Sequence, residues 1–132
     1  MTSVLDASAL LAFLGNEPGG DTVSGAILQD AAISAANWAE VLSTLADRRQ
    51  NPQDVVDSLQ ALGILGRRLS VIPLVEEDAI RIAQLRALTI ALGLSLGDRA
   101  CLALGLRLGL PVGTADGIWT SLDLGVRVHL VR

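Results

Sequence analysis

Short apolar segments alternate with longer amphipathic segments along the whole chain of 132 residues. The short apolar segments have the length of buried strands and lie at 4–5, 32–34, 69–73, 110–114 and 126–131. The segments with helical spacing lie at 7–14, 21–29, 37–49, 52–63, 76–92, 96–108 and 117–122. This alternation predicts an α/β fold with a mostly parallel central sheet. No linker or internal repeat interrupts it, so we expect one domain over 1–132.

Polar residues and a proline mark the predicted helix starts. Asp21, Asn37 and Ser95 each precede a helical segment as N-cap residues, and Asn51 does so ahead of Pro52. The segment 37–49 and a second helix that starts at Pro52 and ends near Gly63 or Gly66 are therefore expected to form a hairpin of two antiparallel helices over 37–66. We expect this hairpin to expose apolar surface that a partner protein or a second copy of the chain covers.

Composition limits where the protein works and what it binds. Hydrophobic residues make up 51% of the chain, which favours a substantial buried core. No uncharged apolar run approaches the roughly 18 residues of a membrane span, and the N-terminus lacks the basic stretch of a signal peptide. We therefore expect a cytoplasmic protein without a membrane partner. The single cysteine excludes an internal disulfide and a multi-cysteine zinc site.

The charge pattern excludes several chemistries. The net charge is −4, and all 10 basic residues are arginine. A chain without lysine has no Walker A loop and no Schiff-base lysine. An acidic chain poor in aromatic residues is also not a broad nucleic-acid binder of the basic-patch kind. Any contact with RNA is expected to be local and to depend on a metal ion.

Four acids stand where a predicted strand ends or a predicted helix begins: Asp6, Glu40, Asp98 and Asp116. In a parallel sheet these positions share the carboxyl edge, where ligands bind. Each acid could instead serve only its own helix, as an N-cap or as the acid of a capping box. If the four converge, their mutual repulsion calls for a cation, and an all-oxygen set suits Mg²⁺ or Mn²⁺.

Other nucleophiles are poorly placed for catalysis. His129 is the only histidine and falls in the last predicted strand, so we interpret it as a structural or surface residue. Cys101 falls in an apolar helical run and is expected to be an inert core thiol. A water activated by a metal ion is therefore the expected nucleophile.

These motifs resemble the PIN-domain family and, within it, the VapC-type toxins of bacterial toxin–antitoxin pairs. The resemblance rests on VLDASALLAFL at 4–14, NWAEV at 37–41, LSLGDRACLALG at 94–105, TAD at 114–116 and LDLGVRV at 122–128. It implies a three-layer fold with a parallel sheet in the order 3-2-1-4-5. It also implies an Mg²⁺- or Mn²⁺-dependent endoribonuclease that a VapB-type antitoxin inhibits.

The resemblance also assigns roles to residues. Asp6, Glu40, Asp98 and Asp116 match the acidic quartet of the family. Asp6, Asp98 and Asp116 are the expected metal ligands, and Glu40 is expected to act through water. Ser8 and Thr114 match supporting hydroxyl positions, and Arg99 could contact RNA or the antitoxin or form a surface salt bridge. Gly117 departs from the family, because many relatives carry arginine there.

Two other functions remain open from the sequence. One is a PIN-type module that binds a partner without catalysis. The other is a phosphotransfer domain that forms an aspartyl phosphate, although such domains use a lysine that this chain lacks.

Overall fold

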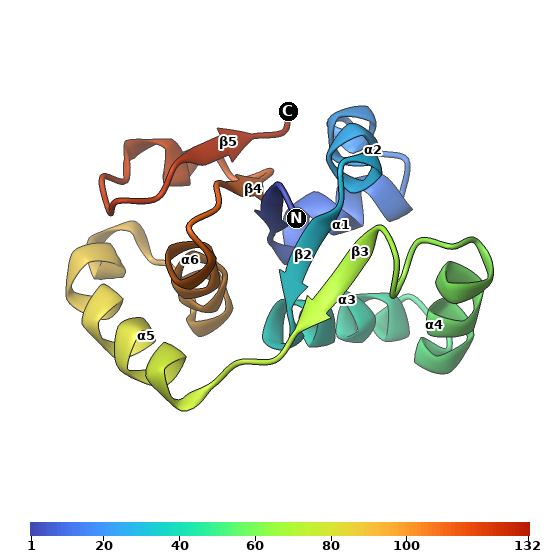
Figure 1. Ribbon diagram of the computed structural model, residues 1–132, viewed down its shortest axis with the longest axis horizontal. Helices are drawn as coiled ribbons and strands as arrows, with labels where there is room; N and C mark the ends of the chain where they lie inside the picture. Colours follow the sequence, from blue (N-terminus) through green and yellow to red (C-terminus); the bar gives the residue numbers. More distant parts are fainter.

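In the computed structural model, which describes residues 1–132, five parallel strands form one sheet in the order β3-β2-β1-β4-β5 (Figure 1). The strands are β1 (Ser3–Leu5), β2 (Ala31–Ser34), β3 (Leu69–Ile72), β4 (Val112–Thr114) and β5 (Val128–Leu130). The predicted α/β class and strand order are therefore confirmed. The order reverses between β1 and β4, which is where ligands bind in sheets of this kind.

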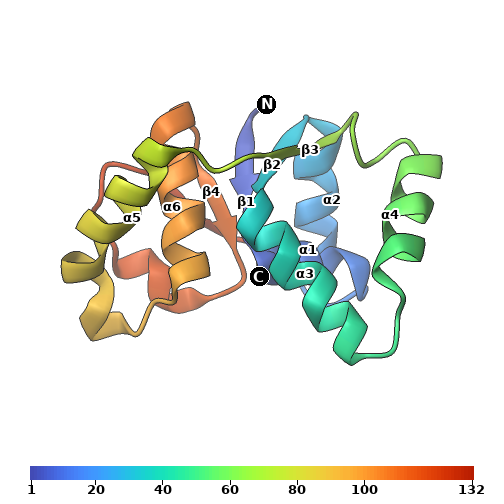
Figure 2. The ribbon, with the colours of Figure 1, turned by 90° about the horizontal axis from the view of Figure 1, so that it is seen from below.

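Helices cover both faces of the sheet, so the fold has three layers (Figure 2). The α-helices are α1 (Ala7–Leu14), α2 (Gly20–Leu28), α3 (Ala35–Asp47), α4 (Pro52–Ala61), α5 (Glu76–Thr89) and α6 (Leu96–Leu108). The short 3₁₀ helices are η1 (Ile90–Leu92) and η2 (Gly117–Ser121). Figure 2 shows α5 and α6 on one side of the sheet and α1 to α4 on the other.

Strand residues alternate between the two faces of the sheet. Leu5 and Ile33 pack into the core beneath α1 to α4, whereas their neighbours Val4 and Ala32 pack beneath α5 and α6. Helix α6 is buried from Arg99 to Gly105, as its apolar sequence predicts. Both faces are apolar, as expected for a parallel sheet covered on both sides.

Two predicted helix caps are wrong. Helix α2 begins after Gly19 rather than at Asp21, because Gly19 adopts the left-handed conformation (φ +94°) and lies against the backbone of Val131. Helix α3 is capped by Ser34, whose hydroxyl accepts a hydrogen bond from the backbone N–H of Asn37. The caps predicted at Asn51 and Ser95 are confirmed.

Two other predicted boundaries also differ. The helix expected over 76–92 is α-helical only to Thr89, after which the chain tightens into η1. The last strand is shorter than expected and pairs only over Val128–Leu130, because β4 offers three residues to pair with.

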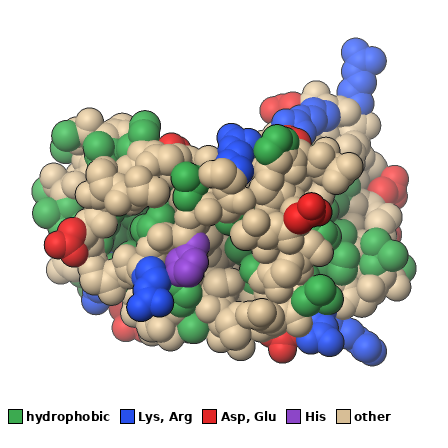
Figure 3. Space-filling view, turned by 90° about the horizontal axis from the view of Figure 1, so that it is seen from above, with side chains coloured by type: hydrophobic (Ala, Val, Ile, Leu, Met, Phe, Trp, Pro, Cys, Tyr) green, Lys and Arg blue, Asp and Glu red, His purple; other side chains and the backbone are tan.

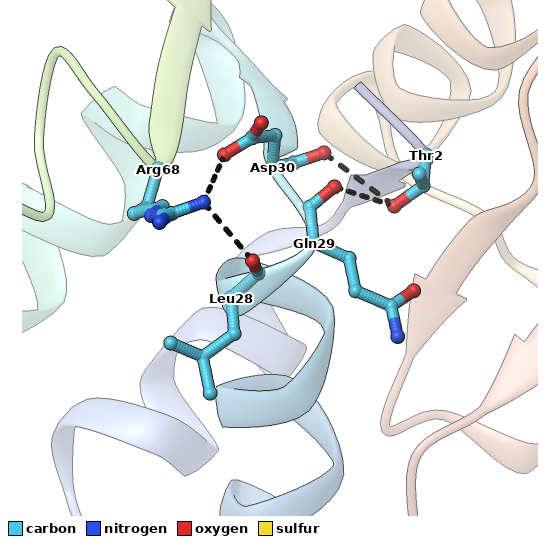
Figure 4. A network of polar contacts seen from close by, with 5 residues as sticks. All are labelled: Thr2, Leu28, Gln29, Asp30 and Arg68. Carbon is cyan, nitrogen blue, oxygen red and sulfur yellow. Dashed lines mark hydrogen bonds and ion pairs between the residues drawn. The ribbon is translucent and has the colours of Figure 1, made fainter.

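A polar network fixes the amino edge of the sheet (Figure 4). The Thr2 hydroxyl donates to the carbonyls of Gln29 and Asp30, just before β2. Arg68, just before β3, donates to the Leu28 carbonyl and pairs with the Asp30 carboxylate at 3.1 Å. The first residues of β1, β2 and β3 are thus held in register at the edge opposite the predicted site.

Charges are mixed on the face seen in Figure 3, where arginines and acids are interspersed and the single histidine lies at the surface. This face has no continuous basic patch of the kind that binds nucleic acid nonspecifically. No helix has both the length and the apolar character that crossing a membrane requires.

Candidate active site

The four predicted acids line one cavity of about 240 Å³ at the carboxyl edge of the sheet. Asp6 follows β1, Asp116 follows β4, and Glu40 and Asp98 come from the first half of α3 and the first turn of α6. The other residues of the cavity wall are Ala7, Ser8, Leu11, Asn37 and Thr44. No basic side chain contributes to this wall.

Asp6 is the most deeply buried of the four acids, with 4% of its surface exposed. It caps α1 by accepting a hydrogen bond of 2.8 Å from the backbone N–H of Ala9. The Ser8 hydroxyl donates to both carboxylate oxygens, and the Thr114 hydroxyl donates to one of them at 2.6 Å. These bonds satisfy both oxygens and hold the carboxylate in one orientation, next to the end of β4.

The same two hydroxyls hold the loop that carries Asp116. Ser8 accepts from the backbone N–H of Ala115, and Thr114 accepts from the backbone N–H of Asp116, both at 3.0 Å. Asp116 itself caps η2 by accepting from the backbone N–H of Ile118. Ser8 and Thr114 therefore lie in the supporting positions expected from the sequence.

Asp98 forms a capping box with Ser95 at the start of α6. Its backbone N–H donates to the Ser95 hydroxyl, and one carboxylate oxygen accepts from the Ser95 backbone N–H at 2.8 Å. The capping interpretation is thus right for Asp6, Asp98 and Asp116. Capping engages one oxygen of Asp98 and one of Asp116, so it leaves the second oxygen of each free to bind a ligand.

Glu40 does not cap a helix, so for this acid the capping interpretation is wrong. It lies in the second turn of α3, because the helix starts at Ala35. One carboxylate oxygen accepts a hydrogen bond of 2.8 Å from the side-chain amide of Asn37. The carboxylate packs over Gly97, where any side chain would collide with it.

The acids of the cavity affect each other's protonation. Burial raises the pKa of Asp6 above its ordinary value, and this effect is larger than that of the hydrogen bonds from Thr114, Ala9 and Ser8, which lower the pKa. Partial burial also raises the pKa of Glu40, against the hydrogen bond of Asn37. The negative charge of Asp98 adds to both increases. A cation in the cavity would favour the ionised forms and offset these increases.

The residues fit a hard divalent cation in their chemistry, because the wall offers carboxylates and hydroxyls and no competing positive charge. Asp6, Glu40, Asp98 and Asp116 are the candidate ligands. The fit does not extend to a preformed shell of ligands: no three acids are close enough in this structure to share one ion.

Arg99 does not reach the cavity. It is 93% buried between α6 and α5, and its guanidinium donates to the Ile82 carbonyl at 2.9 Å. It pairs with no acid, because the two ion pairs of the protein are Arg68–Asp30 and Arg107–Asp78. This buried position supports neither a contact with RNA or antitoxin nor the alternative of a surface salt bridge.

The remaining nucleophiles lie where the sequence indicated. Cys101 is fully buried on α6, and burial raises the pKa of its thiol well above the ordinary value. His129 is exposed on β5, outside the acidic cavity.

Sequence reasoning missed the role of Asn37 in the site and treated it only as a helix cap. The signal was present, because residues three apart on a helix share a face and Asn37 precedes Glu40 by three. The contributions of Leu11 and Thr44 to the cavity wall were also missed. They depend on how α1 packs against α3, which local patterns do not reveal.

The fold and the site together define a class of protein. Its members have a doubly wound parallel sheet and an acid-lined cavity next to the strands between which the strand order reverses, here β1 and β4. The sequence matches the family model for the PIN domain over residues 3–123, and the chain belongs to this family. A search of curated proteins found no match.

Solved structures with the same fold include several toxin proteins. A toxin–antitoxin complex from Klebsiella pneumoniae aligns with a TM-score of 0.71 and 20% identity over 95% of both chains. VapBC2 from Rickettsia felis, bound to a promoter DNA fragment, aligns with a TM-score of 0.71 and 14% identity over 98% of both chains. VapC20 from Mycobacterium tuberculosis, described as a Sarcin-Ricin loop cleaving toxin, gives a TM-score of 0.69 and 14% identity, covering 96% of this chain and 99% of VapC20.

Proposed function

We propose that this protein is an Mg²⁺- or Mn²⁺-dependent endoribonuclease and the toxin of a toxin–antitoxin pair. The observation that carries the proposal is the convergence of four carboxylates from separate elements on one cavity without a basic side chain. Membership of the PIN family and the likeness to solved VapC toxins support it. The absence of lysine argues against the phosphotransfer alternative, which uses a lysine beside its aspartate.

In the proposed reaction Asp6, Asp98 and Asp116 would hold the metal ion, and Glu40 would hold a water molecule beside it. Binding would draw these acids closer together, since no three of them are close enough in this structure to share one ion. A divalent ion held by these carboxylates would supply the activation of water that phosphodiester hydrolysis requires. The hydroxyls of Ser8 and Thr114 keep the Asp6 carboxylate oriented throughout, because both donate to it.

The proposed partners are RNA, as substrate, and a VapB-type antitoxin, as inhibitor. Among the structural neighbours are a toxin–antitoxin complex and VapBC2, and VapC20 is described as a Sarcin-Ricin loop cleaving toxin. A homodimer is proposed as well, because Leu62, at the end of the hairpin that α3 and α4 form, is an exposed apolar side chain. The proposed place of action is the cytoplasm.

The test is cleavage of a total RNA preparation by the purified protein. We expect cleavage with Mn²⁺ or Mg²⁺ and none in excess EDTA. Asp98→Asn should keep the capping box, since an amide oxygen also accepts from Ser95, yet lose about 100-fold or more in rate, the order of loss when one group that stabilises the charge of a transition state is removed. The matched control is Asp54→Asn, because Asp54 holds the same third position of α4 and lies outside the acidic cavity.

Full cleavage in EDTA, or by the Asp98→Asn variant, would contradict a metal nuclease. A folded protein that binds its partner but cleaves no RNA under any metal would instead be the non-catalytic PIN module.

A further inference from the structure

Asn37 is buried inside the protein and connects α3 to the start of α6. The residue is 1% exposed. The amide nitrogen donates to the Glu40 carboxylate at 2.8 Å and to the Gly97 carbonyl at 2.9 Å. The amide oxygen accepts from the Ser34 hydroxyl at the end of β2. One side chain thus joins a strand end, a cavity acid and the first turn of another helix.

The orientation of this amide is fixed by its partners. Glu40 and Gly97 present only acceptor oxygens, whereas the Ser34 hydroxyl can donate. Turning the amide over would place its oxygen against a carboxylate and a carbonyl, so only one orientation satisfies all three contacts. Both amide hydrogens are used, and a buried polar group with its bonds satisfied is held in one place.

Gly97 complements Asn37 from the other side. The Glu40 carboxylate lies against the Gly97 Cα, where a Cβ atom would collide with the carboxylate. Backbone strain is not the reason for glycine here, since the left-handed glycines of the chain lie elsewhere. The missing side chain therefore provides the space in which Asn37 holds Glu40, one residue before Asp98.

We propose that Asn37 is a positioning residue for Glu40: together with the space above Gly97, its amide holds the Glu40 carboxylate at the wall of the acidic cavity. The catalytic part of this inference rests on the proposed nuclease function, whereas the contact itself does not. A merely structural Asn37 would join α3 to α6 through Gly97 and would leave Glu40 unaffected.

The first test is made without metal or RNA, by NMR of the Asn37 side-chain NH₂ group. We expect slow hydrogen exchange in the parent protein. Glu40→Ala should shift both NH₂ resonances and accelerate their exchange at least about tenfold, because the carboxylate acceptor is gone. Glu40→Gln should restore the protection, because its amide oxygen also accepts. The matched control is Glu77→Ala on α5, which should change neither quantity.

The second test measures cleavage in Mn²⁺ by Asn37→Asp, Glu40→Ala and the double variant. Asn37→Asp keeps the size and the acceptor for Ser34 but removes both donors. We expect each single variant to lose at least about tenfold and the double variant to be no slower than Glu40→Ala, since groups that act as a unit are not additive. The control is Asn51→Asp, which replaces one good N-cap by another and should keep the parent rate.

Each outcome decides one of the two proposals. Unchanged Asn37 resonances in Glu40→Ala, or losses that multiply in the double variant, would overturn the positioning role while leaving the nuclease intact. A parent protein that cleaves no RNA would refute the nuclease, and the NMR experiment would still decide whether Asn37 holds Glu40. If Asn37→Asp fails to fold, the NMR experiment on Glu40→Ala and Glu40→Gln still tests whether Asn37 holds Glu40.

Discussion

At the scale of single residues, the Asp6 carboxylate accepts more hydrogen bonds than any other acid of the cavity. Its donors come from α1 and from β4, which are more than 100 positions apart in the chain. Hydrogen bonds to the ionised form lower the pKa of Asp6, yet burial outweighs them and the net shift is upward. The hydroxyls of Ser8 and Thr114 therefore partly offset the cost of a buried charge.

Thr114→Val tests this offset, because valine has nearly the same shape and lacks the hydroxyl. The change removes the donor to Asp6 and the acceptor for the backbone N–H of Asp116. We expect the free energy of unfolding to fall by about 1–3 kcal/mol, measured by denaturant titration. The control is Thr120→Val, at an exposed position on η2, which should change the free energy of unfolding by less than about 0.5 kcal/mol. Equal effects of the two variants would contradict a special role for the Thr114 hydroxyl.

The four acids of the candidate site could be predicted from the sequence, because strand ends and helix starts meet at one edge of a parallel sheet. Asp6, Asp98 and Asp116 follow this rule, whereas Glu40 lies one turn further along α3 and reaches the same cavity. The position of Arg99 could not be predicted this way. It adjoins Asp98 in the chain, but the direction of its side chain depends on how α5 packs against α6.

At the scale of secondary-structure elements, the caps explain which boundaries were predictable. Asn51 and Ser95 are each the only capping residue next to their helix, and both were predicted correctly. Ser34 and Asn37 are both good caps three residues apart, so the sequence alone does not choose between them. Ser34 is the cap in the structure because β2 ends at this residue and the Ser34 backbone is already extended.

Helix α4 has the fewest buried residues of the six α-helices. It buries only Leu59, and at its end Leu62 is 72% exposed. We expect Leu62→Asp to leave the free energy of unfolding within about 0.5 kcal/mol, as for other surface changes, and to break association with a second copy or with the antitoxin. Light scattering of the pure protein and co-purification with the antitoxin measure the two associations.

The control for this variant is Leu28→Asp. Leu28 is similarly exposed, at 66%, but belongs to α2 rather than to the hairpin of α3 and α4. Assembly that survives Leu62→Asp, with an unchanged circular dichroism spectrum, would show that the hairpin is not the interface.

At the scale of the whole molecule, the order of the strands decides where charge accumulates. The order in which the chain adds strands reverses between β1 and β4, so Asp6 and Asp116 follow neighbouring parallel strands, and α3 and α6 add Glu40 and Asp98 at the same edge. This topology was predictable because alternating strands and helices allow few arrangements and the motifs resemble a known family. The distances between the acids were not, because they depend on side-chain packing.

The convergence of acids makes a prediction about stability that separates a metal site from helix caps. The charge of Asp98 raises the pKa of both Asp6 and Glu40, so its repulsion destabilises the metal-free protein at neutral pH. The same charge favours the start of α6 by about 0.3–1 kcal/mol through the helix dipole. Asp54 has only this second, favourable role at the start of α4.

In EDTA at pH 7 we therefore expect Asp54→Asn to lower the melting temperature by roughly 1–4 °C, and Asp98→Asn to raise it or leave it unchanged. With Mn²⁺ at about 100 times its dissociation constant, the parent and Asp54→Asn should gain roughly 5–10 °C, since binding to the folded state alone adds about 2.7 kcal/mol. Asp98→Asn should gain much less, because it lacks one ligand.

Thermal melts of the three proteins, with EDTA and with Mn²⁺, measure these changes in melting temperature. If both variants instead melt lower by the same amount and Mn²⁺ stabilises none of the proteins, Asp98 is only a helix-start residue and the cavity is not a metal site.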